Sequence, residues 1–444
     1  MFVARNNAQS VAAERVVPWA APTPIHPINA FVPLPGSKSL TNRELVLAAL
    51  ANDTSTIVAP LRSRDTNLMI NGLTTLGTVF ESETVGEIEQ LRVTPAQELT
   101  GSGTIDCGLA GTVMRFLPAV AALALGPTGF DGDPYARKRP MGPVLDALRQ
   151  VGVDINDDGR GALPFTVHGF GSVSGGRVSL DASLSSQFVS GLLLAAARFE
   201  EGVHVVHTGE HLPSIPHIEM TLETLTARGV KAYSPEAGVW VAEPGPIAAR
   251  TVTIEPDLSN AAPFLAAALV TGGSVTVPLW PHTTTQVGDQ LRSLLTHFGA
   301  TVTKTEDKLT VTGQPDGKIN GVQLHIPEAG ELAPALVGLA ALADEPSQIT
   351  GIGHIRHHET DRIAALVAEI NNLGGDAREL PDGIEVRPAQ LHGGLWRAYA
   401  DHRMATTGAL IGLRVPGVEI DDIACTSKTM PDFIGMWARA LGCE

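Results

Sequence analysis

The sequence predicts an α/β protein of two domains, each built from three copies of one repeated unit. Two kinds of helical segment alternate along the chain, six copies of each, and β-branched strands follow them. The pairs recur at roughly 70–75 residues and fill nearly the whole chain of 444 residues, a regularity that is typical of repeat architectures. A unit of this length suits two helices with several strands.

The first segment is a helix of small apolar residues that leads through a tight turn into a β-branched strand. Aromatic residues make up only 5% of the chain, so these helices carry little bulk and can pack closely. The six copies, of which the first reads LVLAALANDTSTIVAP, begin at Leu45, Phe116, Phe188, Pro263, Pro334 and Thr406.

The second segment is a more amphipathic helix that in most copies ends in Gly before a strand. Leu or Ile recurs at helical spacing, and the Gly stands where a left-handed C-cap is expected. The six copies, of which the first reads TNLMINGLTTLGTVFES, begin at Thr66, Gly142, Glu219, Val287, Arg362 and Phe433.

Composition limits the function. The formal net charge is −16, which argues against nucleic acid as a partner, although a local group of cations can still bind small anions. The three cysteines, Cys107, Cys425 and Cys443, are widely separated and lack metal-ligand spacing, so we expect no disulfide framework. There is no secretory signal and no apolar run long enough for a bilayer. We expect a soluble cytoplasmic protein.

The residues in front of the six small-residue helices predict an anion-binding cleft. Equivalent positions of a repeat gather at common ends of the domains, and helix N-termini present free N–H groups and a positive dipole to anions. A lone Ser or Thr there is most often a plain N-cap, but Lys38, Arg43, Arg115 and Arg403 stand at the same positions. The neutral and acidic residues at these helix starts are Ser39, Gly111, Thr112, Ser185, Ser186, Gln187, Asp257, Ser259, Asn260, Glu331, Asp401 and His402.

Three other clusters fit the same cleft, although each alone could be a solvated surface turn. They are Asp133–Pro140 with its three cations, His358–Arg362 at a helix start, and Thr426–Thr429 after a strand. Glu359 beside Arg362, and His402 beside Arg403, also offer acid–base groups next to cations. His357 and His358 lack a third ligand, so we expect no metal.

These motifs together resemble the 5-enolpyruvylshikimate-3-phosphate (EPSP) synthases of bacteria. The resemblance runs from about Pro33 to the C-terminus. Its ordered motifs are LPGSKSLTNR (34–43), GLAGTVMRFLP (108–118), the basic turn ending at Arg139-Pro140, SLSSQF (183–188), ETDR (359–362), DHRM (401–404) and CTSKTMPDF (425–433).

The resemblance implies a fold and a reaction. The fold is the two-domain, inside-out enolpyruvyl transferase fold of six βαβαββ units, with one domain formed by 1–36 plus 256–444, the other by 37–255, and the active site in the cleft between them. The reaction joins the enolpyruvyl group of phosphoenolpyruvate to the 5-hydroxyl of shikimate 3-phosphate by addition and elimination. It needs no cofactor. The family is usually monomeric and is the target of glyphosate.

The resemblance also implies residue roles. Glu331 is the expected base, and Glu359 and Lys38 are candidates for the proton transfers. The expected shikimate 3-phosphate ligands are Lys38, Ser39, Arg43, Ser185, Ser186, Gln187, Ser214, Glu331 and His358. The expected phosphoenolpyruvate ligands are Lys38, Gly111, Arg139, Gln187, Arg362, Arg403 and Lys428.

The chain departs from the family pattern at several of these positions. The family base is usually Asp, so Glu331 is one methylene longer, and Glu328 competes for the same alignment. His358 replaces a common Lys, and His217 a common Tyr. Leu109 and Phe116 also differ from the usual residues. These changes affect detailed affinity rather than the reaction class.

Two other functions compete with this one. The sister enolpyruvyl transferase that acts on UDP-N-acetylglucosamine uses a loop cysteine, and the Asp133–Pro140 loop has none. A non-catalytic sugar-phosphate-binding protein would keep Arg43, Ser185 and Ser186, but could dispense with Glu331, Glu359 and Arg403. The presence of all of these residues favours an enzyme.

Overall fold

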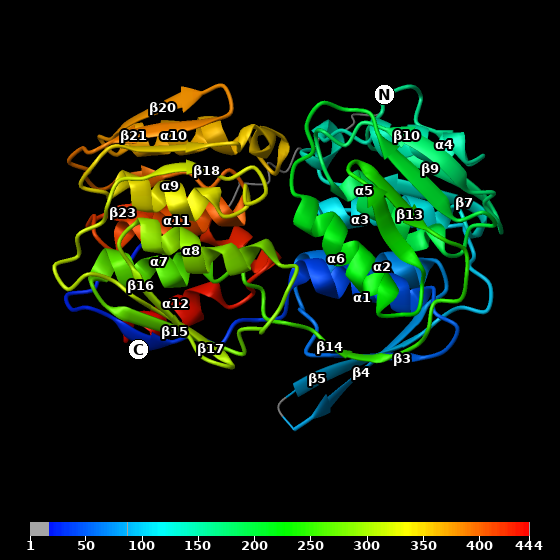
Figure 1. Ribbon diagram of the computed structural model, residues 1–444, viewed down its shortest axis with the longest axis horizontal. Coiled ribbons are helices and arrows are strands. Elements are labelled where there is room, and N and C mark those ends of the chain that lie inside the picture. Colours follow the sequence, from blue (N-terminus) through cyan, green and yellow to red (C-terminus); the bar gives the residue numbers. More distant parts are fainter. Residues whose placement is uncertain (1–16, 87, 444) are drawn as a thin grey trace, which may run out of the picture.

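The computed structural model describes residues 17–86 and 88–443, and Figure 1 shows them as two lobes side by side. We name the lobes by their helices, the α1–α6 lobe and the α7–α12 lobe. The described residues form six sheets, five of four strands and one of three. Each sheet stands for one of the six predicted units, so the repeat and the α/β fold class are confirmed.

Each unit of the α1–α6 lobe has a small-residue helix, a strand, an amphipathic helix and a hairpin. The first comprises α1 (Lys38–Ala49), β3 (Ser55–Val58), α2 (Arg64–Thr75), β4 (Val79–Val85) and β5 (Ile88–Thr94). The second comprises β6 (Thr104–Asp106), α3 (Gly111–Ala121), β7 (Leu125–Asp131), α4 (Gly142–Gln150), β8 (Asp154–Asn156) and β9 (Phe165–Phe170). The third comprises β10 (Gly176–Leu180), α5 (Gln187–Ala196), β11 (Val203–His207), α6 (Ile215–Thr226), β12 (Ala232–Glu236) and β13 (Val239–Ala242).

The α7–α12 lobe repeats this order, except that its last unit ends after the second helix. The fourth unit comprises α7 (Ala262–Thr271), β15 (Ser274–Pro278), α8 (Leu291–His297), β16 (Thr301–Lys304) and β17 (Lys308–Thr312). The fifth comprises β18 (Gln323–His325), α9 (Ala333–Ala341), β19 (Ser347–Thr350), α10 (Arg362–Asn372), β20 (Asp376–Leu380) and β21 (Gly383–Arg387). The sixth comprises β22 (Gly394–Trp396), α11 (His402–Gly412), β23 (Val418–Ile420) and α12 (Phe433–Leu441).

Three strands belong to sheets that are distant in sequence. β14 (Thr251–Thr253) pairs in parallel with β3, and β2 (Asn29–Phe31) pairs in parallel with β15. β1 (Trp19–Ala20) pairs antiparallel with β23 and completes the last sheet. The sequence did not predict this exchange, because it is set by where the chain passes between lobes rather than by any local pattern.

The chain passes between the lobes twice, and the two passages lie against each other. Gly36 forms an isolated β-bridge with Pro256. The Ser37 N–H donates to the Glu255 carbonyl at 2.7 Å, and the Asp257 N–H donates to the Pro35 carbonyl at 2.9 Å. Buried apolar residues form two clusters, one from Leu45 to Ile254 and the other from Ala21 to Val32 together with Leu258 to Ala440.

The small-residue helices form the centre of each lobe, where close packing requires small side chains. Every residue of α3 is buried, and α3 lies against α5. A Cβ placed on Gly191 of α5 would lie 2.1 Å from the Arg115 carbonyl oxygen, so only Gly permits this approach. The Ala- and Gly-rich composition thus serves helix-to-helix packing. None of the described helices is both long and apolar enough to cross a membrane.

Arg414 supports the ends of two central helices. It lies just after α11, and its guanidinium donates to the carbonyls of Val270 in α7 at 2.8 Å and Leu342 at the end of α9 at 3.2 Å. It also donates to the carbonyl of Gly317. A cation at helix C-termini satisfies free carbonyls and opposes the negative end of each dipole.

Replacing Arg414 with Ala should lower the stability of the α7–α12 lobe by ~2 kcal/mol, because charged hydrogen bonds to otherwise unpaired carbonyls are lost. A drop in Tm of about 4–8 °C should follow, measured by calorimetry. Arg387→Ala is the control, since the Arg387 side chain is exposed and, among the described residues, forms an ion pair only with Glu385. An equal, small change in both variants would contradict this role for Arg414.

Candidate active site

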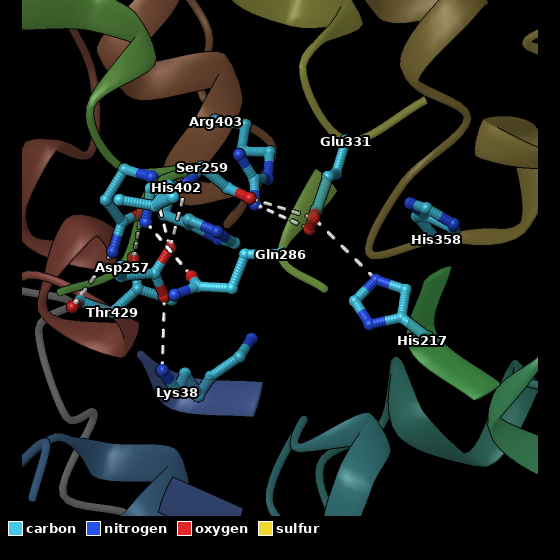
Figure 2. A network of polar contacts seen from close by, with 12 residues as sticks. Lys38, His217, Asp257, Ser259, Gln286, Glu331, His358, His402, Arg403 and Thr429 are labelled. Atoms are coloured by element: carbon cyan, nitrogen blue, oxygen red, sulfur yellow. Dashed lines mark hydrogen bonds and ion pairs between the residues drawn. The ribbon is translucent and has the colours of Figure 1, made fainter. Parts of the chain in front are cut away.

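A cavity opens between the lobes where the N-termini of the small-residue helices meet. Residues from the starts of α1, α5 and α11 line it, together with residues just before α7 and α9. Figure 2 shows Lys38 and His217 reaching it from one lobe, and Glu331 and Arg403 from the other. The convergence predicted from the repeat is therefore present, because equivalent helix ends face a common centre.

Most of the predicted site residues line this cavity. They are Lys38, Ser39, Arg139, Ser185, Ser186, Gln187, Ser214, Glu331, His358, Glu359, Arg362 and Arg403. The other three, Arg43, Gly111 and Lys428, lie directly behind its wall. Glu328, the competitor of Glu331, is exposed and is absent from the lining.

Glu331 lies where the two lobes meet. Its Oε1 accepts a hydrogen bond from the Ser259 hydroxyl at 2.8 Å, and its Oε2 accepts one from Arg403 at 3.0 Å. The His217 Nε2 of the other lobe lies 3.7 Å from Oε1. Burial alone would raise the pKa of Glu331, but Arg403, His217 and Ser259 outweigh it and lower this pKa to about 2. Glu331 is thus a carboxylate held in its charged form.

Glu359 is the centre of a second, more deeply buried group of charges. It accepts hydrogen bonds from Lys428 and, at 2.9 Å, from Arg362. Asp401, which caps α11, receives two further bonds from Arg362 at 2.7 and 3.0 Å. Burial opposes ionisation of Glu359, yet Lys428 and Arg362 keep its pKa well below its usual range. Each cation here is paired with a carboxylate.

Two arginines, Arg115 of α3 and the neighbouring Arg139, lack such a carboxylate partner among the described residues. Arg115 donates to the Gln187 amide oxygen at 3.2 Å, and Arg139 to the Leu109 carbonyl at 3.1 Å. Burial and the neighbouring Arg139 lower the pKa of Arg115. A Cβ on Gly111 would lie 2.6 Å from Arg115 Nη1 and 3.1 Å from both Arg139 and Gln187, so a larger residue would press on these side chains. Two buried, adjacent cations beside this closely packed Gly form a strong site for an anion.

Lys38 begins α1 and faces both lobes. Its backbone N–H donates to Asp257 at 3.1 Å, and its ammonium lies 3.6 Å from Asp65. Burial lowers the pKa of Lys38, and Lys428 and Arg403 add to this effect. A lysine with a lowered pKa can donate and accept protons nearer to neutral pH.

The opposite wall is rich in hydroxyl groups. Ser39, Ser185, Ser186 and Ser214 line it, and Ser214 begins α6 in the left-handed conformation with φ of 56°. Arg43 lies beneath this wall, with its guanidinium bonded to the Ser39 and His217 carbonyls at 2.9 and 2.8 Å. Small hydroxyls over a buried cation are suited to a phosphate and a polyol ring.

Comparison with known proteins identifies the family. The family model described as EPSP synthase (3-phosphoshikimate 1-carboxyvinyltransferase) matches residues 22–437. A curated 3-phosphoshikimate 1-carboxyvinyltransferase from Kocuria rhizophila is 54% identical over 424 residues, which covers 94% of this chain and 95% of the relative. The chain belongs to the EPSP synthase family. The family and enzyme class predicted from the sequence are therefore confirmed.

Solved EPSP synthases share the fold. Two structures from Acinetobacter baumannii align over 95% of this chain, with TM-scores of 0.76 and 0.75 at 22% and 21% identity. At this identity the likeness concerns the fold alone. It confirms the enolpyruvyl transferase architecture that the resemblance implied.

Two polar residues near or in the cavity wall, Gln286 and His354, were not predicted from the sequence. Gln286 donates to the Glu255 carboxylate at 2.8 Å and to the Pro256 carbonyl at 2.9 Å, next to the passage between lobes. His354 lines the cavity near His358, with its pKa lowered to about 4 by burial and Arg362. Neither stands at the start of a small-residue helix, so the repeat gave no signal for them. A search for polar residues five or fewer positions before ETDR would have found His354.

The rival sister transferase gains no support from the cysteines. Cys107 is buried, and none of the three cysteines lines the cavity. Within residues 17–86 and 88–443, no group of three or more His, Cys, Asp or Glu side chains is arranged to hold a metal ion.

The depressed pKa of Glu331 has a consequence for stability. Its folded pKa, about 2, lies below the value of ~4.3 for an unfolded Glu, so its ionisation stabilises the fold above that pH. This contribution should fall as the pH drops from about 5 toward 2. As the pH falls through this range, the Tm of wild type should therefore fall relative to the Tm of Glu331→Gln. A pH-independent difference, measured by thermal melts, would contradict the assigned pKa.

Proposed function

We propose that this chain transfers the enolpyruvyl group of phosphoenolpyruvate to the 5-hydroxyl of shikimate 3-phosphate and releases phosphate. The supporting observation is the cavity between the lobes, where paired carboxylates and cations face a wall of serine hydroxyls. The two substrates are both multiply anionic, and the cavity concentrates positive charge although the chain as a whole is acidic. The family assignment points to the same reaction.

Phosphoenolpyruvate is the ligand we assign to the cationic half. Arg362, Arg403 and Lys428 suit its carboxylate, since arginines pair with carboxylates in a bidentate manner. Arg139 and Gln187 suit its phosphate, and Gly111 lets the backbone lie close to them, since a Cβ there would come within 2.6 Å of Arg115 and 3.1 Å of Arg139. We place Lys38 between the two substrates. It lines the same cavity from the start of α1.

Shikimate 3-phosphate is the ligand we assign to the hydroxyl wall. Ser185, Ser186 and Ser214 face its phosphate, and Ser39, Gln187, Glu331 and His358 face its ring hydroxyls. The Arg43 guanidinium already bonds to the Ser39 and His217 carbonyls. The charge of Arg43 thus attracts the phosphate from behind the serine side chains. For Arg43 to contact the ligand directly, these hydrogen bonds would have to break.

Glu331 is the proposed base for the 5-hydroxyl. With a pKa of about 2 it is fully ionised but a weak proton acceptor, because Arg403 and Ser259 stabilise its charge. Phosphoenolpyruvate competes for Arg403 when it binds. Once Arg403 turns to the substrate carboxylate, the pKa of Glu331 rises and the carboxylate can accept the hydroxyl proton. The substrate therefore activates the base.

The second proton moves to and from C3 of phosphoenolpyruvate. Addition requires a proton at C3 while the 5-hydroxyl oxygen bonds to C2, and elimination removes a C3 proton as phosphate leaves. Lys38 and Glu359 are the two proposed carriers. Burial lowers the pKa of Lys38, which favours its role as a donor. Glu359 is held ionised by Lys428 and Arg362, so like Glu331 it becomes a better acceptor once phosphoenolpyruvate competes for these cations.

The two lobes are proposed to be the two domains, 1–36 with 256–444 and 37–255. The separate apolar clusters and the paired passages at Gly36 and Pro256 support this division. Contacts between the lobes, such as Thr285 Oγ1 to Glu223 at 2.9 Å, would hold the lobes together around the substrates. Exclusion of water would limit hydrolysis of the tetrahedral intermediate. We further propose that the enzyme acts as a cytoplasmic monomer, without nucleic acid or membrane partners.

The test is phosphate release by the pure protein, measured with each substrate alone and with both. Release should require both substrates and should fall at least ~100-fold in Glu331→Ala, as expected when a general base is removed. Glu328→Ala is the matched control, because Glu328 is exposed and outside the cavity. It should retain wild-type rates.

Three outcomes would change the account. Activity retained in Glu331→Ala would keep the reaction but move the base to another residue. Loss in Glu328→Ala alone would reverse the assignment of the two carboxylates. Binding of shikimate 3-phosphate without any release would favour the non-catalytic sugar-phosphate-binding function.

A further inference from the structure

The turn that leads into α11 has a costly backbone conformation. Tyr399 and Ala400 connect β22 to α11, and their φ angles are 55° and 54°. Residues with a side chain rarely adopt this left-handed region, and two in succession are disfavoured unless their surroundings enforce it. Ala400 is exposed, so its own packing gives little support. Something else must hold the turn.

Glu369 of α10 is placed to do so. Its carboxylate is fully buried, with an exposed fraction of 0%. Its Oε1 accepts the Tyr399 hydroxyl at 2.6 Å, and its Oε2 accepts the Arg397 backbone N–H at 3.1 Å. The Arg397 guanidinium lies farther away, at 3.5 Å. One buried carboxylate therefore forms hydrogen bonds with the turn at two points, one on each side of Ala398.

The short hydrogen bond from Tyr399 depends on a protonated hydroxyl. Burial and the bond to Glu369 raise the pKa of Tyr399 to about 12. The Tyr399 hydroxyl thus remains a donor at all ordinary pH values. Asp421 adds a third support, since it accepts the Ala398 N–H at 2.8 Å.

The residues that follow the turn are those assigned to phosphoenolpyruvate. Asp401 comes next and holds Arg362 through two hydrogen bonds, and its Oδ1 also accepts the Arg403 backbone N–H at 2.9 Å. The Arg403 guanidinium reaches Glu331. A change in the two left-handed residues would rotate the start of α11 and move Arg403 and Asp401 together.

We propose that Glu369 and Tyr399 are positioning residues for phosphoenolpyruvate, which act by holding the left-handed turn before Asp401 and Arg403. Neither lines the cavity, so neither is a catalytic residue. The inference rests on the proposed function, because it takes Arg362 and Arg403 as ligands of phosphoenolpyruvate. Most residues assigned to shikimate 3-phosphate, the serine wall and Gln187, lie on the other lobe. Only Glu331 and His358 contact Arg403 and Arg362, so the turn should affect this substrate much less.

The test is Tyr399→Phe, which removes the hydroxyl and keeps the ring. We expect KM for phosphoenolpyruvate to rise about tenfold, the factor for losing about one hydrogen bond from the structure that positions its ligands. KM for shikimate 3-phosphate should stay within about twofold. Rates are measured well below the Tm of each variant, with the second substrate saturating. Glu369→Gln should show the same split, since an amide cannot accept both donors.

Tyr233→Phe is the matched control. Tyr233 also donates to a Glu, Glu243, at 3.3 Å, but this bond is exposed to solvent beside β12. Its kinetic constants should equal those of wild type.

If the turn acts by positioning, lowering the strain of its left-handed backbone should partly restore binding of phosphoenolpyruvate. Gly adopts the left-handed region at no steric cost, so Ala400→Gly added to Tyr399→Phe should return KM for phosphoenolpyruvate part of the way to wild type. A purely structural role predicts no such recovery.

Several results would overturn the inference. One is a lower Tm in Tyr399→Phe with both KM values unchanged, and another is an equal rise in both. Inactivity of the wild type with both substrates would instead refute the proposed function. An active wild type with an unchanged Tyr399→Phe would refute only the positioning role.

Discussion

The pairing of buried carboxylates with cations between the lobes is the interaction on which this site depends. Arg403 bonds to Glu331, Lys428 to Glu359, and Arg362 to Glu359 and Asp401. Burying cations without partners would cost free energy. In the absence of substrates, these carboxylates offset that cost. The same pairs keep Glu331 a weak base. An anionic substrate that competes for the cations therefore both fills the site and changes its acid–base chemistry.

The fold makes this arrangement possible through its repeated units. Each unit places a small-residue helix in the core and directs the N-terminus of that helix to the side where the lobes meet. The exchanged strands β2 and β14 bring the chain between the lobes at Gly36 and Pro256, directly beside Lys38 and Asp257. Residues from five helix starts can then surround one cavity, although they are up to hundreds of positions apart in sequence.

Much of this could be predicted from the sequence, and particular residues show why the rest could not. The six helix pairs were visible because small apolar residues recur at a fixed period, and equivalence within the repeat predicted that Lys38, Gln187 and Arg403 would converge. Gln286 and Glu369 were missed because their partners, Glu255 and Tyr399, are distant or follow no periodic pattern. Likewise, no pattern indicated that Arg43 would lie beneath the cavity wall rather than on it.

Proton uptake on binding of phosphoenolpyruvate is the most direct measure of whether the substrate takes Arg403 from Glu331. Calorimetry at pH 5 in buffers of different ionisation enthalpy would measure it, with the site filled by a 5-deoxy analogue of shikimate 3-phosphate so that no reaction follows. Because the pKa of Glu331 should rise from about 2, wild type should take up a fraction of a proton more than Glu331→Gln does. Equal uptake by the two proteins would show that the substrate leaves the Arg403–Glu331 pair intact, and would contradict the account.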